Sequence, residues 1–248
     1  MAIAGSPSRY EIKRDGADAV FAYESLILKV HTPSGWLDRL RTRRQHGRLA
    51  RQVQGAALLA SARIFAPRTL AHGMASWSGQ IVEILVIERI AGQTLLQLLA
   101  APRGNPSAEH NAADRAGELI ARLLMAGLFN RDGKPSNLIV ASEQGHLCVI
   151  DSVGVRPLRT KREWHEAMAR MLSSLLIEPL GVGLLVRRTL ARRVLYSMHR
   201  CLWALQAEPG DDKPMDESWE TQSSRAAWAM TAKQIAAHGN LRPKVSPL

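Results

Sequence analysis

The chain has 248 residues, of which 46% are apolar, and its formal net charge is +11 at pH 7. This apolar fraction is typical of globular proteins and excludes a chain that is disordered by composition. The two cysteines, Cys148 and Cys201, exclude a disulfide framework and have no metal-site spacing, so we expect buried thiols in a reducing compartment.

The first ninety residues predict a strand-rich region with one helix. Short β-rich runs at residues 9–14, 19–24 and 25–31 are separated by Gly16 or by charged residues, which is typical of strands joined by tight turns. From Trp36 to about Ala62 apolar residues recur near helical spacing, with Gly47 and Gly55 as points of interruption. Pro67 marks a break, and residues 73–90 predict a hairpin that turns at Ser78-Gly79.

The remaining residues predict mostly helices. Residues 91–100 indicate a linker and a short helix, and an amphipathic helix is expected over 107–126, with Ser107 as N-cap and Gly127 as stop. A second hairpin is expected to turn at residues 142–145, between strands at 138–141 and 146–151. From about Thr160 the chain predicts helices with breaks at residues 178–183 and 208–214.

The location of the protein is predicted from its apolar runs and its charge. The amino terminus lacks the apolar core of a signal peptide, and Met171–Val186 is too short to span a bilayer. We therefore expect a cytoplasmic protein. Basic clusters at Asp38–Arg51 and Val186–Arg193 indicate either solvated helix faces or peripheral binding to an acidic surface at the inner face of the membrane.

One stretch, "FNRDGKPSNLIV" at Phe129–Val140, carries more polar groups than a turn needs. Asp132, Lys134 and Asn137 share a loop that ends where a strand begins, and Asp151 follows Asn137 after fourteen residues. A hairpin between Asn137 and Asp151 would bring the two back to one edge. Carboxylate and amide oxygens suit Mg²⁺, a lysine suits phosphate charge, and a free carboxylate can orient a hydroxyl. This combination indicates phosphoryl transfer.

The same stretch resembles the catalytic loop of protein kinases, His-Arg-Asp-Leu-Lys-Pro-x-Asn followed by a strand. Asn130 stands for the His and Gly133 for the Leu, and "VIDSV" occupies the place of the Mg-binding Asp-Phe-Gly element. Upstream, "LILKV" resembles the third strand with its phosphate-pairing lysine, here Lys29. "ILVIERI" resembles the fifth strand and the hinge, where adenine is held by backbone groups from Glu88 to Ile90. The resemblance covers roughly residues 8 to 155.

Among kinase-like proteins, the chain is most similar to the lipopolysaccharide kinase family, which phosphorylates Kdo or heptose sugars with ATP and Mg²⁺. The size of the chain, the missing Ala-Pro-Glu element, the compact helical end and Ala50-Arg51-Gln52-Val53 before Pro67 carry this resemblance. It implies an α+β, two-lobed kinase-like fold: a small antiparallel sheet with one helix at residues 1–90 and a compact helical lobe at 91–240. Residues 241–248 would form a flexible tail.

The resemblance also implies roles for individual residues. Asp132 would orient the acceptor hydroxyl, Lys134 would neutralise the moving phosphoryl group, and Asn137 and Asp151 would hold Mg²⁺. The remaining positions would bind ATP: Lys29 at its phosphates, Gly16 in a reduced phosphate loop, Gln52 at the place of the lysine-pairing Glu, and Glu88 and Ile90 at the hinge. A sugar or glycolipid would be the acceptor, and no nucleic acid is expected as a partner.

Two departures from the kinase pattern keep alternatives open. Gln52 can accept a hydrogen bond from Lys29 but brings no charge, and only Gly16 remains of the glycine-rich loop. The chain is thus a sugar kinase, a pseudokinase that binds nucleotide or a partner without transferring phosphate, or another small-molecule kinase such as those for aminoglycosides or choline. The further hypothesis of a nucleic-acid-binding module rests on the positive charge alone, because the sequence has no aromatic stacking platform and no recognisable binding motif.

Overall fold

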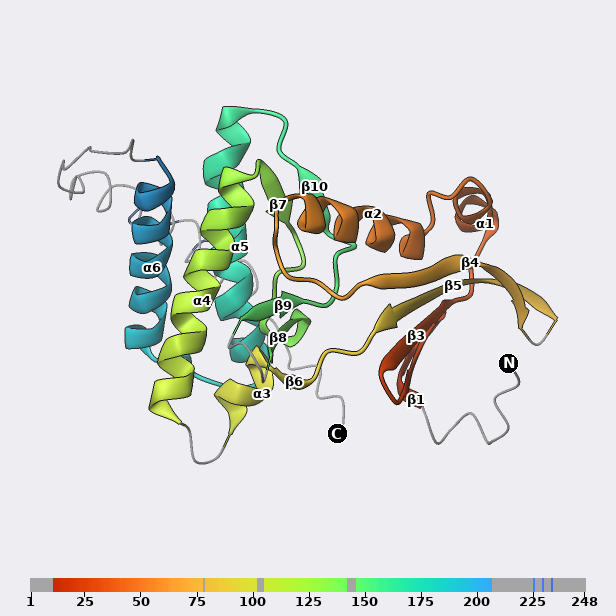
Figure 1. Cartoon of the computed structure of the whole chain (residues 1–248), viewed down its shortest axis with the longest axis horizontal. Helices are drawn as coiled ribbons and strands as arrows, with labels where there is room; N and C mark the ends of the chain where they lie inside the picture. Colours follow the sequence, from red (N-terminus) through yellow and green to blue (C-terminus); the bar gives the residue numbers. More distant parts are fainter. Residues whose placement is uncertain are drawn as a thin grey trace.

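The structure is a computed structural model that describes residues 11–77, 79–101, 105–141 and 146–206 and the single positions 225, 229 and 233 (Figure 1). An antiparallel sheet comes first and the long helices follow, which confirms the predicted α+β organisation. The expected turns at Ser78 and at residues 142–145, the break at 208–214 and the tail at 241–248 lie outside the described residues. The domain boundary near residue 90 stays a prediction.

The first sheet has five antiparallel strands in the order β1-β2-β3-β5-β4. β3 lies in its middle, so its residues pair on both sides: Lys29 lies opposite Val20 on β2 and opposite Leu85 on β5. Gly79, with a φ of 75°, takes the backbone conformation that the turn between the last two strands requires. The strands are β1 (Glu11–Asp15), β2 (Asp18–Tyr23), β3 (Leu26–His31), β4 (Thr69–Trp77) and β5 (Gln80–Glu88).

Two helices, rather than the one expected, lie between β3 and β4. α1 spans Trp36–Arg43 and α2 spans Arg48–Ser61. Of the two glycines at which the helical stretch could be interrupted, Gly47 does interrupt it, as the N-cap residue of α2. Gly55 lies inside α2 and does not interrupt it. In Figure 1, α2 runs alongside the sheet toward the helical part, and α1 lies at the far end of the molecule.

The second part packs α4, α5 and α6 around one apolar core. Buried residues from all three helices meet there, among them Leu119, Met168, Met171, Met198 and Leu202. The N-cap of α4 (Pro106–Met125) lies two residues earlier than predicted, because the side chain of Asn105 accepts a hydrogen bond from the N–H of Ala108 and Pro106 occupies the first turn. Ser107 is therefore not the N-cap.

The remaining elements frame the loop between α4 and α5. The strands are β6 (Gly92–Thr94), β7 (Leu128–Asn130), β8 (Leu138–Ala141), β9 (Leu147–Val149) and β10 (Val155–Pro157); the helices are α3 (Leu95–Ala100), α5 (Lys161–Gly181) and α6 (Arg188–Gln206), with a 3₁₀ turn at Pro135–Asn137. The break predicted at residues 178–183 falls later, because α5 continues through Pro179 to Gly181.

The two cysteines and the helices agree with what the sequence indicated about thiols and membrane spans. Cys148 is buried and Cys201 half-buried, and both are free thiols; burial raises the pKa of Cys148 to about 12. Within the described ranges, every helix is too short or too polar to cross a bilayer.

Candidate active site

Lys29 on β3 reaches across to α2 and to the segment after β9. Its ammonium group donates to Oε1 of Gln52 at 3.0 Å and to the backbone carbonyl of Ile150 at 3.4 Å. Burial lowers the pKa of Lys29, and the nearby carboxylate of Asp151 acts against this effect. The lysine is thus a part-buried cation in contact with the residue that precedes Asp151.

Gln52 on α2 completes a small hydrogen-bonded triangle. While its Oε1 accepts from Lys29, its Nε2 donates to the same carbonyl of Ile150 at 3.3 Å. The sequence predicted the acceptor but not the donor. A carboxylate at this position could not make the second bond, so Gln52 fits its surroundings in a way that Glu would not.

α2 is held at both ends of the segment that carries Gln52. The buried carboxylate of Glu83 on β5 accepts from the N–H groups of Leu49 and Ala50, at 3.1 and 2.7 Å, and so supplies the cap that Gly47 cannot. Further along, Gly55 lies against the backbone of Ser152, where a Cβ atom would overlap with the carbonyl oxygen. The Ser152 hydroxyl also donates to the carbonyl of Gln52 at 2.7 Å.

The loop from Asn130 to Asn137 is organised by its own side chains. Asn130 is buried, and its Oδ1 accepts from the N–H of Asp132 at 3.1 Å. Asn137 donates through Nδ2 to the carbonyl of Asp132 at 2.9 Å. These two amides fix the backbone on both sides of Asp132, and the second bond leaves Oδ1 of Asn137 as the atom that can accept or coordinate.

Asp151 lies beside this loop because β8 and β9 form the predicted hairpin. Leu138 pairs with Val149, and one step further the N–H of Ile150 donates to the carbonyl of Asn137 at 3.0 Å. Oδ1 of Asp151 accepts from the N–H of Val153 at 3.2 Å. The structure thus brings Lys29, Gln52, Asn137 and Asp151 to one place from four separate elements.

The donor set fits a cation that is only partly held by protein. Among the described residues there is no group of three or more His, Cys, Asp or Glu side chains arranged for a metal ion. Asn137 and Asp151 offer one amide oxygen and one carboxylate. Mg²⁺ suits such a set, because it keeps waters and bridges substrate phosphates rather than filling an all-protein cage.

Asp132 contacts two groups that sequence reasoning missed. Its carboxylate faces the guanidinium of Arg131, with Oδ2 3.1 Å from Nη2, and this hydrogen bond raises the pKa of Arg131. Gly154 also lies against this carboxylate, where a Cβ atom would come within 2.6 Å of Oδ2 of Asp132. The sequence could have indicated that Gly154 belongs to the site, because it is the glycine three residues after Asp151.

Lys134 lies next to a carboxylate of the protein. Its Nζ lies 3.5 Å from Oε1 of Glu178, near the end of α5. The same carboxylate accepts from the N–H and the hydroxyl of Ser136, at 2.7 and 2.6 Å. In this conformation Lys134 therefore neutralises a carboxylate of the protein, and Glu178 is a further residue that the sequence did not suggest.

The other predicted nucleotide contacts come from the turn between β1 and β2 and from the chain at the end of β5. Gly16, with a φ of 56°, lies in the turn between β1 and β2 with open space around it. Glu88 ends β5, where its carboxylate pairs with Arg68 at 2.6 Å and its backbone N–H donates to the carbonyl of Arg68 at 3.1 Å. Ile90 follows in the connection to β6 and is half-buried.

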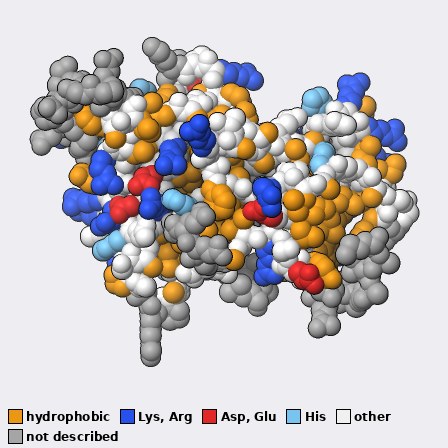
Figure 2. Space-filling model, viewed as in Figure 1, with side chains coloured by type: hydrophobic (Ala, Val, Ile, Leu, Met, Phe, Trp, Pro, Cys, Tyr) orange, Lys and Arg blue, Asp and Glu red, His pale blue; other side chains and the backbone are white. Residues whose placement is uncertain are grey.

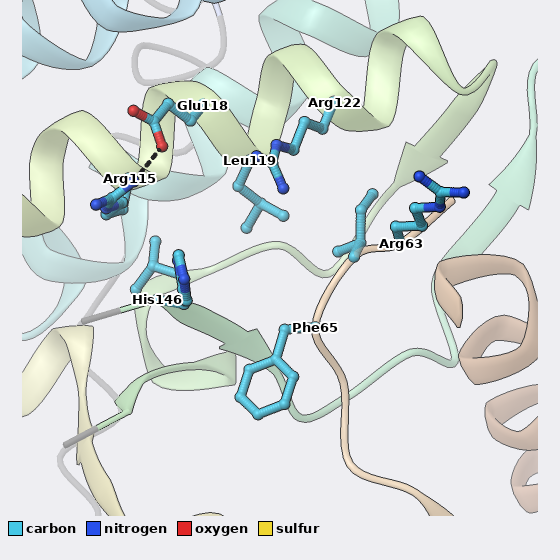
Figure 3. A pocket seen from close by; sticks show the side chains of 9 residues that line it. Arg63, Phe65, Arg115, Glu118, Leu119, Arg122 and His146 are labelled. Atoms are coloured by element: carbon cyan, nitrogen blue, oxygen red, sulfur yellow. Dashed lines mark hydrogen bonds and ion pairs between the residues drawn. The ribbon is translucent and has the colours of Figure 1, made fainter. Parts of the chain in front are cut away.

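A separate pocket lies between α4, the chain after α2 and the start of β9 (Figure 3). Its volume is about 190 Å³, and Arg63, Arg122 and His146 contribute to its lining. Arg115 at its edge pairs with Glu118 at 2.8 Å. None of the predicted site residues lines this pocket, so it is not the candidate active site.

Comparisons with known proteins concern the fold. No protein-family model and no curated protein matches the chain. Among solved structures the chain is similar to the bifunctional kinase-methyltransferase WbdD, with a TM-score of 0.51 and 18% identity over 88% of this chain and 47% of that one. Two further WbdD structures align with TM-scores of 0.49 and 0.47.

The chain spans about half the length of WbdD, and an identity this low speaks for the fold alone. The fold agrees with the arrangement described above, in which an antiparallel sheet carrying Lys29 is followed by a helical part that contains the Asp132 loop. The protein therefore has a protein-kinase-like fold.

Proposed function

We propose that this protein is an ATP-dependent phosphotransferase that moves the γ-phosphoryl group to a hydroxyl of a sugar or glycolipid. The observation that carries the proposal is the position of Lys29, whose ammonium lies 3.0 Å from Gln52 and 3.4 Å from the carbonyl that precedes Asp151. A part-buried lysine beside a carboxylate and an amide oxygen is suited to bind the phosphates of a nucleotide, where positioning and charge neutralisation supply most of the catalysis.

Each residue has a role that follows from its surroundings. Lys29 would bind the α- and β-phosphates, because burial of its ammonium favours an anionic ligand. Asp132 would orient the acceptor hydroxyl and take up its proton, since the amides of Asn130 and Asn137 fix the backbone on either side of it. The backbone from Glu88 to Ile90 would hold the base.

Asn137 and Asp151 would hold Mg²⁺ together with the nucleotide. When bound there, the ion would neutralise charge on the phosphates. Lys134 would have to leave Glu178 to contact the transferred group, and its 48% exposed side chain has room to do so. The proposal includes a cytoplasmic location, because ATP is the phosphate donor. The sugar or glycolipid acceptor rests on the resemblance to lipopolysaccharide kinases.

The test is incubation with labelled ATP, Mg²⁺ and a panel of inner-core sugars and glycolipids, followed by detection of the phosphorylated product. We expect Asp132→Asn and Asp151→Asn each to lower product formation by at least about 100-fold. Glu166→Gln, which removes an exposed carboxylate charge on α5, is the control and should retain full activity. Transfer that survives both substitutions would show that the roles are misassigned.

The alternative is a pseudokinase that binds nucleotide without transferring phosphate. Two observations favour it: Gln52 brings no charge to Lys29, and Lys134 is paired with Glu178. Binding of ATP that requires Lys29, with no product from any acceptor in the panel, would support this reading. For this binding assay Lys29→Met is compared with Lys233→Met, which removes an exposed lysine outside the sheet.

A further inference from the structure

Helix α1 is attached to the sheet by its polar side and exposes its apolar side. Trp36, Leu37 and Leu40 follow one another at helical spacing, and their side chains are 72%, 50% and 37% exposed. Thr42, the one buried residue of α1, lies on the opposite side of the helix. A surface helix of a globular protein is ordinarily oriented the other way, with its apolar stripe toward the core.

Hydrogen bonds of Asp38 and His31 attach α1 to the sheet. Nε2 of His31, at the end of β3, lies 3.1 Å from Asp38 on α1, while its Nδ1 lies 2.8 Å from Asp18 on β2. Asp38 also accepts from the N–H of Ser34 at 3.0 Å. These contacts hold the polar side of α1 against the sheet, so the outward direction of Trp36 and Leu37 is built into the fold.

The apolar surface continues from α1 onto the hairpin of β4 and β5. A groove of about 280 Å³ separates them, lined by Arg39 and Arg43 on one side and by Gln80 and Ile81 on the other. On the hairpin, Ile81 is 57% exposed and Trp77 is 41% exposed. Figure 1 places α1 and the β4–β5 hairpin at one end of the molecule, and Figure 2 shows apolar and basic side chains intermixed at that end.

The charge of this surface is positive and is not neutralised by the protein. Within the described ranges, none of its four arginines forms an ion pair; they are Arg39, Arg41, Arg43 and Arg44. The acidic residue of α1, Asp38, is engaged by His31. The second basic cluster differs, because Arg187 pairs with buried Glu109 and Arg193 with Asp114, both on α4. The two clusters of the sequence thus have different surroundings.

We propose that α1 and the hairpin form a docking face for a bilayer that contains anionic phospholipids. The face consists of Trp36, Leu37, Leu40 and Ile81 around the groove of Arg39 and Arg43. Trp and Leu on one side of a helix, flanked by arginines, are the composition of helices that lie in the membrane interface. The groove would take a lipid phosphate between its two guanidinium groups, and the apolar side chains would enter the headgroup region.

The alternatives are a protein partner and a second copy of this chain. The unpaired arginines favour the bilayer, because a protein would have to offer a matching acidic surface and a second copy would bring the same positive charge to the contact. The inference does not rest on the proposed function, since membrane binding requires no phosphate transfer. A docked α1 would hold β3, and with it Lys29, in a set orientation near a lipid-linked acceptor.

The test is co-sedimentation of the full chain with lipid vesicles in the absence of ATP. Vesicles of phosphatidylcholine alone are compared with vesicles that contain about 30 mol% phosphatidylglycerol, and we expect at least about tenfold stronger binding to the latter. The double variant Arg39→Gln/Arg43→Gln should lose most of this gain. Arg188→Gln/Arg192→Gln, which removes the same charge from exposed positions on α6, should bind within about twofold of the wild type.

The apolar side is tested with Trp36→Ser, which should also lower vesicle binding, and thermal unfolding checks that each variant is folded. The arginine variant decides the question if Trp36→Ser unfolds. Equal losses for the two arginine pairs would mean attraction by net charge and would overturn the docking face, as would equal binding to both kinds of vesicle. Dimerisation in sedimentation velocity that Trp36→Ser abolishes would assign the face to a second copy instead.

Discussion

The carboxylate of Glu83 lies so close to Gly47 that a Cβ atom at position 47 would come within 2.5 Å of Oε2 of Glu83. The N-cap glycine of α2 and the buried glutamate on β5 therefore depend on each other: the missing side chain makes room for the carboxylate, and the carboxylate caps the helix. Because α2 carries Gln52, this contact also sets the position of the residue that holds Lys29.

Glu83→Gln should destabilise the protein and weaken nucleotide binding. The substitution removes a negative charge from the amino end of α2 and one of its two acceptor oxygens, which is worth about 2 kcal/mol at a buried position. Chemical denaturation measures the free energy of unfolding, and Glu24→Gln on the exposed turn before β3 is the control. An unchanged free energy of unfolding would mean that α2 needs no cap from β5.

Gln52→Glu should not create a better kinase-like site. A carboxylate would strengthen the hydrogen bond from Lys29, but it would lose the bond from Nε2 and place a second acceptor oxygen toward the carbonyl of Ile150. We expect the Kd for ATP with Mg²⁺ to rise by about threefold to tenfold. Gln54→Glu, on the exposed side of α2, should leave Kd unchanged. Tighter binding would indicate that Gln52 merely stands in for a lost carboxylate.

His31 should make stability depend on pH. The hydrogen bond to Asp18 raises the pKa of His31, and the contact with Asp38 adds to this effect, because both ring nitrogens face carboxylates. A raised pKa in the folded state means that the stabilisation is complete below the unfolded pKa of about 6.5 and is lost as pH rises through the higher folded pKa.

The measurement is the free energy of unfolding of the wild type minus that of His31→Gln at several pH values. This difference should be largest below the unfolded pKa of about 6.5 and should shrink as pH rises through the raised pKa of His31. His46→Gln, at an exposed position between α1 and α2, is the control and should show no such trend. A difference that stays constant over the range would show that His31 is not charged in the folded protein.

Local signals in the sequence account for the parts of the fold and site that were predicted. Short stretches of sequence contain strand β3 with its lysine, the loop around Asp132 and the segment that ends at Asp151. The hairpin of β8 and β9 joins the Asp132 loop to Asp151. The N-cap of α4 was misplaced by two residues because Asn105 and Ser107 are both good caps, and Pro106 decides between them.

The contacts that were not predicted join residues far apart in the chain. Glu83 caps α2 from 33 and 34 residues away, Gln52 donates to a carbonyl 98 residues away, and Glu178 binds Ser136 across 42 residues. No local pattern marks such partners, because glutamate and glutamine are common surface residues of helices. The outward orientation of α1 was likewise invisible, since its apolar spacing is the same whichever side it turns to the sheet.

Gly154→Ala should impair phosphate transfer more than nucleotide binding. A methyl group at this position would come within 2.6 Å of Oδ2 and 2.9 Å of the backbone nitrogen of Asp132, so the proposed hydroxyl-orienting carboxylate has to move. The N–H of Arg131 also donates to the carbonyl of Gly154 at 3.1 Å, which prevents the two segments from simply separating. The three atoms nearest to the added methyl group all belong to Asp132.

We therefore expect product formation in the acceptor assay to fall by about 10- to 100-fold, because a misplacement of about 1 Å costs this much. The Kd for ATP should change by less than about threefold, since the groups proposed to bind the phosphates stay in place. Gly73→Ala on β4, where a methyl group would meet open space, is the control and should behave as the wild type. A loss of ATP binding equal to the loss of transfer would show that Gly154 supports the whole site and not Asp132 in particular.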